Sequence, residues 1–428
     1  MARTTEKTLR NQVMYQIFVR NFSKEGTFKA VTKELPRIKK LGVDIVWFAP
    51  IHPIGKKCRK GTLGSPYAIS DYRKVNPEYG TLADFKATVK AIHDNGMKCI
   101  IDVVYNHTSP DSVLSKQHPE WFYHKEDGSF GNRVGDWTDI IDLDYSHKEL
   151  WDYQIETLKT WAKIVDGFRC DVAPLVPIDF WLKAREEVGK VNPDCIWLSE
   201  SVEPGFIISL RELGLTAQSD SEMYQAFDIL YDYDIYTNLT EYAAGNGPLQ
   251  DYAEAINRQE YIYPDNYVKL RFLENHDQPR ARFLFPTARA LRNATAFLYF
   301  QKGMTLIYAG QECGVSHLPS LFEKDDVDWK SKENIDLKGL MKTLYNIKQD
   351  ELFTNSSYRT KTYEDNVLKA IHSRGDKKIV GIFSFKGEPG IIPINVEDGV
   401  YENMIDGSKI EVMHGYVSLA GEPVIMRV

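Results

Sequence analysis

Short runs of apolar and β-branched residues alternate with longer stretches of helical spacing along most of the chain. The stretches Ala83–Asn95, Leu150–Ile164 and Phe180–Val188 place apolar residues three and four positions apart, as helices packed on a core do. Strands that alternate with helices form βαβ units and a parallel sheet. Eight runs predict an α/β fold, a closed (β/α)8 TIM barrel over residues 1–350, and the glycine fingerprint of an open dinucleotide-binding sheet is absent. The runs are Val13–Val19, Val43–Ala49, Cys99–Val104, Gly167–Val172, Ile196–Ser199, Tyr224–Ile229, Val268–Leu273 and Thr305–Ala309.

Two long connections interrupt the alternation. Residues 107–147 show no helix or strand repeat and contain the polar, aromatic stretch HPEWFYHKEDGSFGNRVGDWTD. Long loops in compact domains are usually functional, and the loops after barrel strands line the active-site face. We therefore expect a small subdomain, inserted after the third strand, that covers the cleft. The connection 231–266 is long as well and is predicted to be an embellished helix.

From residue 351 to residue 428 the apolar residues alternate with a period of two. The runs Val367–His372, Lys378–Phe385, Ile391–Asn395 and Tyr416–Ala420 show this alternation, with turn signals at glycines between them. This pattern predicts a C-terminal antiparallel β-sandwich domain.

The composition excludes several kinds of partner. A net charge of −7 lacks the basic field that binding to nucleic acid requires. No run of about 18 apolar residues predicts a membrane span, and the N-terminus shows no apolar run of signal-peptide length. The five cysteines have no zinc-ligand spacing and are interpreted as free thiols, which favours a cytoplasmic location. Nothing in the pattern indicates an oligomeric state.

Four predicted strands end in clusters of ionisable side chains. Barrel strands deliver catalytic groups at their carboxyl ends, from several strands at once. Four such ends on one rim therefore predict a catalytic site better than they predict four separate structural uses. The segments are IIDVVYNH (100–107), GFRCDVA (167–173), IWLSES (196–201) and FLENHD (272–277).

The acids at these ends match the needs of glycosidic bond cleavage with retention. That reaction uses a carboxylate nucleophile and a carboxylic acid about 5–5.5 Å apart. Asp171 and Glu200 end consecutive strands, so adjacent strands place them face to face. The shorter Asp171 suits the nucleophile, and the longer Glu200 suits the acid/base. Asp277, at the end of the seventh strand, is placed to hold sugar hydroxyls beside a cationic transition state.

Neighbouring side chains are expected to orient these acids. Arg169 lies two residues before Asp171, so both face inward, and the guanidinium keeps the carboxylate ionised. Asp102 also faces inward, either as a structural ion pair of the barrel or as part of the site. His107 and His276 adjoin the acid clusters and supply neutral donors at pH 7, with a purely structural hydrogen-bonding role as the alternative.

In the same order, the four segments resemble the four signature regions of the α-amylase family, glycoside hydrolase family 13. The resemblance covers nearly the whole chain, including the long loop and the C-terminal β-domain. It implies a covalent glycosyl-enzyme intermediate, with Asp171 as nucleophile, Glu200 as general acid/base and Asp277 as the acid that stabilises the transition state. It also implies that a second set of residues contacts or orients the sugar: Tyr67 in GSPYAISDY, together with His107, Arg169, His276 and Asp102.

Departures from the family pattern leave the cleaved linkage open. Exo-acting members usually carry an Asp after the stacking tyrosine, but Ala68 stands there, which favours an open cleft and longer chains. Val172 after the nucleophile is common in the α-1,6-cleaving branch. We expect a hydrolase of the α-amylase type that cleaves α-1,4 bonds in maltodextrins, starch or glycogen-like α-glucans. The alternatives are an α-1,6-glucosidase, a transglycosylase and a non-catalytic amylase-like protein, the last disfavoured because all three acids are present.

Calcium is the one cofactor that the resemblance raises, and none is expected to be required. Asn106 resembles a calcium ligand of the family, and Asp142, in DIIDLDYSH, falls where the family has an acid in its protruding subdomain. Oxygen donors of this kind suit Ca²⁺. The calcium-linked histidine of typical amylases is missing, because Leu175 stands in its place.

Overall fold

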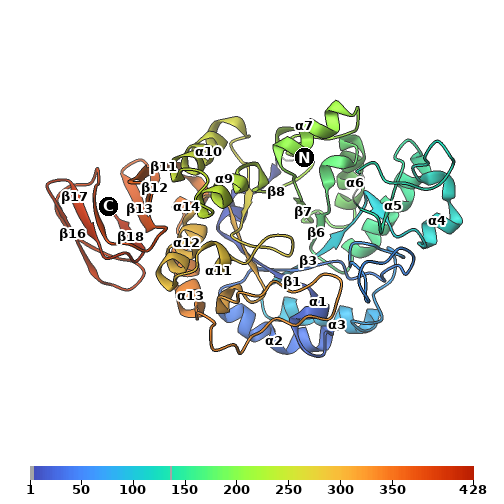
Figure 1. The fold of residues 1–428 in the computed structure, drawn as a ribbon, viewed down its shortest axis with the longest axis horizontal. Coiled ribbons are helices and arrows are strands. Elements are labelled where there is room, and N and C mark those ends of the chain that lie inside the picture. Colours follow the sequence, from blue (N-terminus) through green and yellow to red (C-terminus); the bar gives the residue numbers. More distant parts are fainter. Residues whose placement is uncertain (1–3, 135–136) are drawn as a thin grey trace.

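The computed structural model describes residues 4–134 and 137–428, and its centre is a closed barrel of eight parallel strands (Figure 1). The predicted TIM barrel is therefore confirmed. Neighbours around the ring follow the chain order, with the last strand closing on the first. The strands are β1 (Val13–Ile17), β2 (Ile45–Phe48), β3 (Lys98–Val103), β6 (Gly167–Cys170), β7 (Ile196–Ser199), β8 (Ile229–Tyr231), β9 (Lys269–Arg271) and β10 (Met304–Tyr308).

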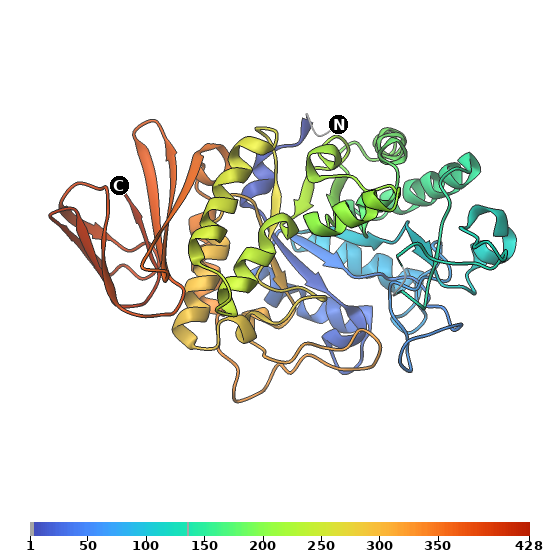
Figure 2. The same cartoon turned by 45° about the horizontal axis from the view of Figure 1, so that its top comes forward.

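Helices surround the barrel (Figures 1 and 2). Side-chain caps fix several of their starts: the hydroxyl of Thr81 accepts the N–H of Asp84, whose carboxylate accepts the N–H of Thr81 in return. None of the helices in the described part of the chain combines the length and apolarity of a membrane span. The longer helices are α2 (Phe28–Lys40), α3 (Leu82–Asp94), α5 (Lys148–Ala162), α6 (Ile178–Gly189), α7 (Pro204–Glu212), α9 (Tyr233–Ala243), α10 (Leu249–Ile262), α12 (Ala288–Phe300) and α13 (Lys338–Lys348).

Two local predictions were wrong. The run Tyr224–Ile229 is not a strand, because a capping box between Ser219 and Glu222 starts the short helix α8 (Asp220–Met223), and the chain enters the barrel only at Ile229. The connection 231–266 holds two helices, α9 and α10, instead of one. Gly245, at a positive φ of 77°, ends the first of them, and Pro248 precedes the second.

The two ends of the segment inserted after β3 pair as a small antiparallel sheet. β4 (His107–Thr108) pairs with β5 (Ile141–Asp142), so His107 lies opposite Asp142. In the sequence, the helix α4 (Val113–Gln117) falls between these two strands. Gly135 and Asp136 of this segment lie outside the described residues.

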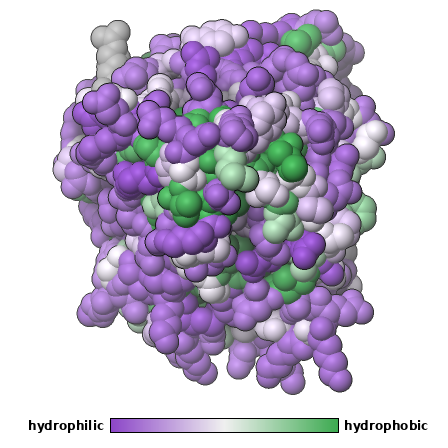
Figure 3. All heavy atoms as spheres, turned by 90° about the vertical axis from the view of Figure 1, so that its left-hand side faces the viewer, coloured by the Kyte–Doolittle hydropathy of each residue, from purple (hydrophilic) through white to green (hydrophobic). Residues whose placement is uncertain are grey.

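The C-terminal part consists of two four-stranded antiparallel sheets at one end of the molecule (Figure 1). The inner sheet packs on the barrel, with β11 against α10 and β13 against α12. Figure 3 shows the outer end, where hydrophobic residues interrupt a mainly hydrophilic surface. The exposed large side chains of the outer sheet are Ile391, Val400, Met413 and Tyr416. The inner sheet is β11 (Ser357–Tyr363), β12 (Val367–Arg374), β13 (Lys377–Ser384) and β18 (Val424–Arg427), and the outer sheet is β14 (Gly390–Pro393), β17 (Tyr416–Leu419), β16 (Lys409–Met413) and β15 (Gly399–Glu402).

Gly167 controls the approach of the two strands that carry Asp171 and Glu200. It lies opposite Ile196 in the register of β6 and β7, and a Cβ atom added there would stand 2.4 Å from the Ile196 carbonyl oxygen. We expect Gly167→Ala to push the strands apart and to lower the free energy of unfolding in urea by about 1–3 kcal/mol. Gly189→Ala is the control, because no atom lies within 4 Å of its added Cβ. Equal stability of Gly167→Ala and the native chain would contradict this reasoning.

Candidate active site

A cavity of about 290 Å³ lies at the carboxyl ends of the barrel strands, and all three predicted catalytic acids line it. The strands end at this rim, which explains why the acids of four separated segments meet. Of the predicted sugar-contacting residues, three line the same cavity, and the other two lie fully buried beside it. The lining includes Lys60, Ser65, Tyr67, His107, Trp137, Asp139, Asp171, Glu200, His276, Asp277 and Phe322, and the buried pair is Asp102 and Arg169.

The guanidinium of Arg169 joins the carboxylates of three neighbouring strands. Its Nη1 donates to Asp102 at 2.9 Å and to Asp171 at 2.7 Å. Its Nη2 forms an ion pair with Glu200 at 2.6 Å, without the angle of a hydrogen bond. The guanidinium carbon also lies 5.3–5.6 Å from three ring centres, those of Trp47, Tyr67 and Tyr231. A fully buried cation is thus matched by charge and by aromatic rings.

A second network connects Asp102 with Asp277 across the cavity. The hydroxyl of Tyr67 donates to Asp102 at 3.1 Å and lies 2.6 Å from Nε2 of His276. Nε2 of His276 also lies 3.0 Å from Asp277. The rings of Tyr67 and His276 stack with their centres 5.2 Å apart. Gln16 contacts Nδ1 of the imidazole at 2.7 Å and fixes its orientation. Asp277 is the open member of the network, with a side chain that is 42% exposed.

An unusual backbone conformation places Glu200. Val172, directly after Asp171, has φ 34° and ψ 43°, a left-handed conformation that β-branched residues rarely adopt. Its N–H donates to Glu200 at 2.7 Å. The two acids are therefore connected twice, through Arg169 and through this strained turn. Such strain is found where the surrounding structure fixes a functional group.

Burial and charge give the carboxyl groups different protonation properties. Burial raises the pKa of Glu200 to about 7, against the lowering effect of Arg169 and with a raising contribution from Asp171. Burial likewise raises the pKa of Asp171 to about 6 and that of Asp102 to about 6, and Arg169 again opposes the shift. Desolvation by the cavity walls works against ionisation of Asp277, but His276 outweighs it and lowers the pKa of Asp277. One acid thus retains its proton near neutral pH while another stays ionised.

His107 lies at the wall formed by the inserted segment. Burial lowers its pKa to about 4, so the ring is neutral at pH 7. Nδ1 faces the amide nitrogen of Asn106 at 3.2 Å, which leaves Nε2–H as the donor. The ring of Trp137 lies 5.8 Å from that of His107. The sequence pointed to this loop as cover for the cleft but did not single out Trp137.

An ion pair between two loops also borders the cavity, and the sequence pattern did not reveal it. Lys60 contacts Asp139 at 3.2 Å, which connects the loop after β2 to the inserted segment. Ala68, whose small side chain favoured an open cleft, is buried and does not line the cavity. The sequence gives little indication of the contact between Lys60 and Asp139, because each residue lies in a loop with ordinary polar neighbours.

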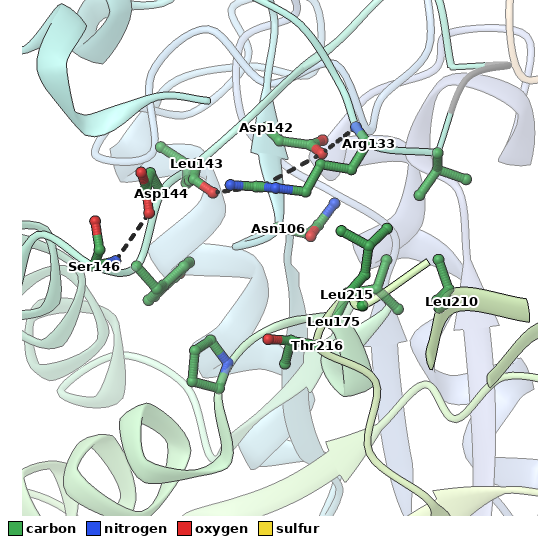
Figure 4. Close-up of a pocket in the computed structure, with 14 residues that line it drawn as sticks. Asn106, Arg133, Asp142, Leu143, Asp144, Ser146, Leu175, Leu210, Leu215 and Thr216 are labelled. Atoms are coloured by element: carbon green, nitrogen blue, oxygen red, sulfur yellow. Dashed lines mark hydrogen bonds and ion pairs between the residues drawn. The ribbon is translucent and has the colours of Figure 1, made fainter. Parts of the chain in front are cut away.

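The predicted calcium ligands line a separate cavity of about 310 Å³ (Figure 4). One oxygen of Asp142 accepts the N–H of Arg133 at 2.7 Å, and the other is buried without a hydrogen bond. The Arg133 guanidinium donates to the Leu143 carbonyl at 3.3 Å and lies 3.7 Å from Asp142. Figure 4 shows it extending between Asp142 and Asn106. Within the described residues, no three His, Cys, Asp or Glu side chains gather as a metal site. Two carboxylates line the cavity, but Asp142 already faces the Arg133 cation and Asp144 accepts the N–H of Ser146, which does not fit the demands of Ca²⁺ for six to eight oxygens.

The fold and the site define a barrel enzyme of the glycoside hydrolase and glycosyl transfer class. The chain belongs to the α-amylase family: the family model of the α-amylase catalytic domain matches residues 5–357, and that of the bacterial α-amylase C-terminal domain matches residues 359–426. Similar solved structures agree. An α-amylase from Lactobacillus plantarum is 46% identical with a TM-score of 0.95, covering 99% of this chain and 100% of that one. The maltogenic α-amylase AmyB from Thermotoga neapolitana is 34% identical with a TM-score of 0.87, covering 98% and 99%.

Curated relatives are longer proteins with two kinds of name. Alpha-amylase MalA of Haloarcula japonica is 26% identical over 402 residues, which cover 89% of this chain and 56% of that protein. An alpha-1,4-glucan:maltose-1-phosphate maltosyltransferase of Myxococcus xanthus is 30% identical over 270 residues, covering 57% and 38%. The chain therefore spans about half the length of the first relative and less of the second.

We propose that the positive charge beside Asp142 is that of Arg133, and that Ca²⁺ is not needed there. The melting temperature of the chain is then expected to stay the same in excess EDTA and in excess CaCl₂. Arg133→Met is expected to melt at a lower temperature, because it leaves a buried carboxylate unpaired, whereas Arg133→Lys keeps the charge and serves as the control. A marked loss of thermal stability of the unaltered chain in EDTA would refute the proposal.

Proposed function

We propose that this enzyme is a retaining α-glycoside hydrolase that cleaves α-1,4-glucosidic bonds in maltodextrins, starch or glycogen-like α-glucans. The observation that carries the proposal is the single guanidinium of Arg169, which contacts both Asp171 and Glu200. Two carboxyl groups bound to adjacent nitrogens of one guanidinium lie close together. A close pair favours double displacement with retention, whereas inverting enzymes separate their acids by about 6.5–9.5 Å to admit a water molecule.

The different environments of the two acids support their assigned roles. Asp171 has a pKa of about 6, below that of Glu200, and accepts a hydrogen bond from Arg169. It is the nucleophile that attacks the anomeric carbon. Glu200, with a pKa raised to about 7, protonates the departing glycosidic oxygen. Once the leaving sugar has departed, the Glu200 carboxylate takes a proton from water, which attacks the anomeric carbon and releases Asp171. One glycosidic bond is broken and one water molecule is consumed, and each of the two sugar products gains a hydroxyl group.

The remaining side chains bind and orient the sugar in this proposal. Asp277 is ionised and open to the cavity, so it is suited to hold hydroxyl groups and to stabilise positive charge in the transition state. Tyr67 offers a ring face next to the reacting carboxylates, and His107 offers a neutral donor. Asp102 and Arg169 are positioning residues, because both are fully buried behind Asp171.

Transglycosylation is the second candidate activity, and the names of several relatives favour it. The maltosyltransferases found among the curated relatives transfer sugar units, as their name states. The same covalent intermediate serves both outcomes, and the acceptor decides between them. Incubation with maltoheptaose, followed by chromatography, separates them: shorter products alone support hydrolysis, and chains longer than the substrate reveal transfer. Parallel incubations with isomaltose and pullulan test the α-1,6 alternative, and cleavage of isomaltose without cleavage of maltoheptaose would overturn the proposed linkage.

We also propose a reducing, cytoplasmic environment for this enzyme. All five cysteines are free thiols in the structure, and four of them are buried. Disulfides are rare in the cytoplasm, where thiols stay reduced. Labelling of Cys58, the exposed thiol, in freshly lysed cells would show whether it is reduced in place.

Removal of either reacting carboxyl group is expected to abolish hydrolysis while the fold remains intact. Asp171→Ala and Glu200→Gln should each lower kcat by at least about 10²–10⁴-fold. The exposed Glu203, changed to Gln, is the control near the same strand end. Near-normal turnover of maltoheptaose in either catalytic variant would reject the mechanism.

Azide rescue distinguishes the two roles in these variants. With an activated aryl α-maltoside, azide replaces the missing carboxylate of Asp171→Ala in one displacement, so the product is the β-glycosyl azide. In Glu200→Gln the intermediate still forms on Asp171, and azide attack on it yields the α-glycosyl azide. The opposite pairing of variant and anomer would exchange the assignments.

The pH dependence of kcat/KM is expected to be bell-shaped, with its maximum between about pH 6 and pH 7. Activity falls on the acid side as the nucleophile Asp171, with a pKa of about 6, takes up a proton. It falls on the alkaline side as Glu200, with a pKa of about 7, loses the proton that the leaving group needs. Glu200→Gln, measured with an activated aryl glycoside, should keep the acid limb and lose the alkaline limb. A maximum well above pH 8 would contradict these assignments.

A further inference from the structure

The C-terminal domain contains a cavity of about 520 Å³ that the catalytic proposal does not use. Its walls come from β11 and β12 of the inner sheet and from the end of β14, with the two residues that follow it, in the outer sheet. Its size falls within the range of about 300–1,000 Å³ that is typical of small-molecule sites. The charged residues that line it are Arg359, Lys361 and Lys369, and no acidic residue is among the lining side chains.

Two of these cations face each other directly. Lys361 on β11 lies opposite Lys369 on β12 in the antiparallel register, so both side chains project from the same face of the sheet. Like charges at directly opposed positions destabilise a sheet. The two charges therefore do not favour this pairing by themselves, and a negative charge between them would.

Lys369 differs from the other buried lysines of the described chain. It is 7% exposed, yet no hydrogen bond or ion pair reaches its ammonium group within the described residues. The stem of Lys369 is buried, but its Nζ atom opens onto the cavity, so the ammonium group is available there to a ligand. The ammonium groups of the other three lysines have partners: Lys269 contacts Asp220 and Asp234, Lys302 contacts Glu260, and Lys348 donates to the carbonyls of Tyr299 and Gln301.

Tyr363 provides both a partial compensation and a binding surface. The ammonium groups of Lys361 and Lys369 lie 5.3 and 5.4 Å from the centre of its ring. A ring quadrupole attracts cations but does not neutralise them. The half-buried Tyr363 and Ile371, together with Pro393, give the cavity an apolar wall next to its cationic one. The combination suits a ligand with a compact anion at one end and a ring at the other.

We propose that this cavity binds a phosphorylated sugar, with the phosphoryl group between Lys361 and Lys369 and the sugar ring against Tyr363. A phosphate monoester carries nearly two negative charges at neutral pH, which match the two ammonium groups, and lysine binds phosphate as a point charge. Arg359 adds a third cation at the rim. The ligand is either a free sugar phosphate or a phosphoryl group carried on an α-glucan chain, because both present the same chemistry. The proposal does not depend on the catalytic assignment.

Titration calorimetry of the full chain with glucose 6-phosphate tests the proposal. Lys369→Met and Lys361→Met keep the aliphatic stems and remove the charges, and Lys378→Met, an exposed lysine on β13, is the control. We expect saturable binding to the unaltered chain and to the control, and at least tenfold weaker binding to the other two variants. Absence of binding to the unaltered chain, or undiminished binding to both cavity variants, would overturn the proposal. All four proteins should hydrolyse maltoheptaose equally, so failure here is separable from failure of the catalytic proposal.

Thermal melting without ligand gives an independent readout. If the lysine pair is kept for binding, its removal relieves repulsion, so Lys369→Met should melt no lower than the unaltered chain. Glucose 6-phosphate should raise the melting temperature of the unaltered chain and leave that of Lys369→Met unchanged. A lower melting temperature for both cavity variants, with no effect of ligand on the unaltered chain, would show that the lysines serve the fold alone and would overturn the proposal.

The source of the phosphoryl group is resolved by a second titration. Phosphorylated dextrins are compared with the same dextrins after phosphatase treatment. Tighter binding of the phosphorylated form, lost in Lys369→Met, identifies a phosphate-bearing glucan. Equal binding of both dextrins, combined with binding of glucose 6-phosphate, identifies the free sugar phosphate.

Discussion

The catalytic face depends on one buried guanidinium. Arg169 has no exposed surface, and carboxylates from three neighbouring strand ends contact it. One positive charge cannot neutralise three negative ones, and burial disfavours the excess charge. The cluster therefore keeps protons that exposed carboxyl groups would lose, which is why the pKa of Glu200 rises to about 7. The electrostatic cost of packing these acids together is the same property that makes one of them a proton donor at neutral pH.

Asp102 extends this constraint to the other side of the cavity. One of its oxygens accepts from Arg169, and the other accepts from Tyr67, whose hydroxyl also contacts His276. The sequence left open whether Asp102 forms a structural ion pair or belongs to the site, and the geometry gives it both connections. Because His276 contacts Asp277 in turn, the orientation of the exposed acid depends on a chain of contacts that starts at Arg169.

Strand order and strand ends were predictable from sequence, but contacts between loops were not. The acids at positions 171, 200 and 277 follow apolar runs, so the barrel topology alone places them on one rim. Lys60 and Asp139 lie in loops whose local pattern resembles any solvated turn, and only the folded chain brings them together. The run that begins at Tyr224 was predicted to be a strand because of its apolar residues. In the structure, the capping box between Ser219 and Glu222 begins a helix directly before it. Local hydrogen bonds took precedence there over apolar periodicity.

The same limit explains why β11 was missed and why it is informative. Its sequence, SYRTKTY, buries every second residue against the barrel and turns cations to the other face. Because this segment contains few strongly apolar residues, its alternation is weak and its sequence resembles that of an exposed loop. In the folded chain, Lys361 stands opposite Lys369, whose ammonium group opens onto the C-terminal cavity and has no acceptor among the described residues. The two arginines described above face acids: Arg169 contacts three carboxylates, and Arg133 faces Asp142. Against that background, two opposed lysines without an acidic partner are a departure, and departures of this kind are expected where a protein gives up stability for a ligand.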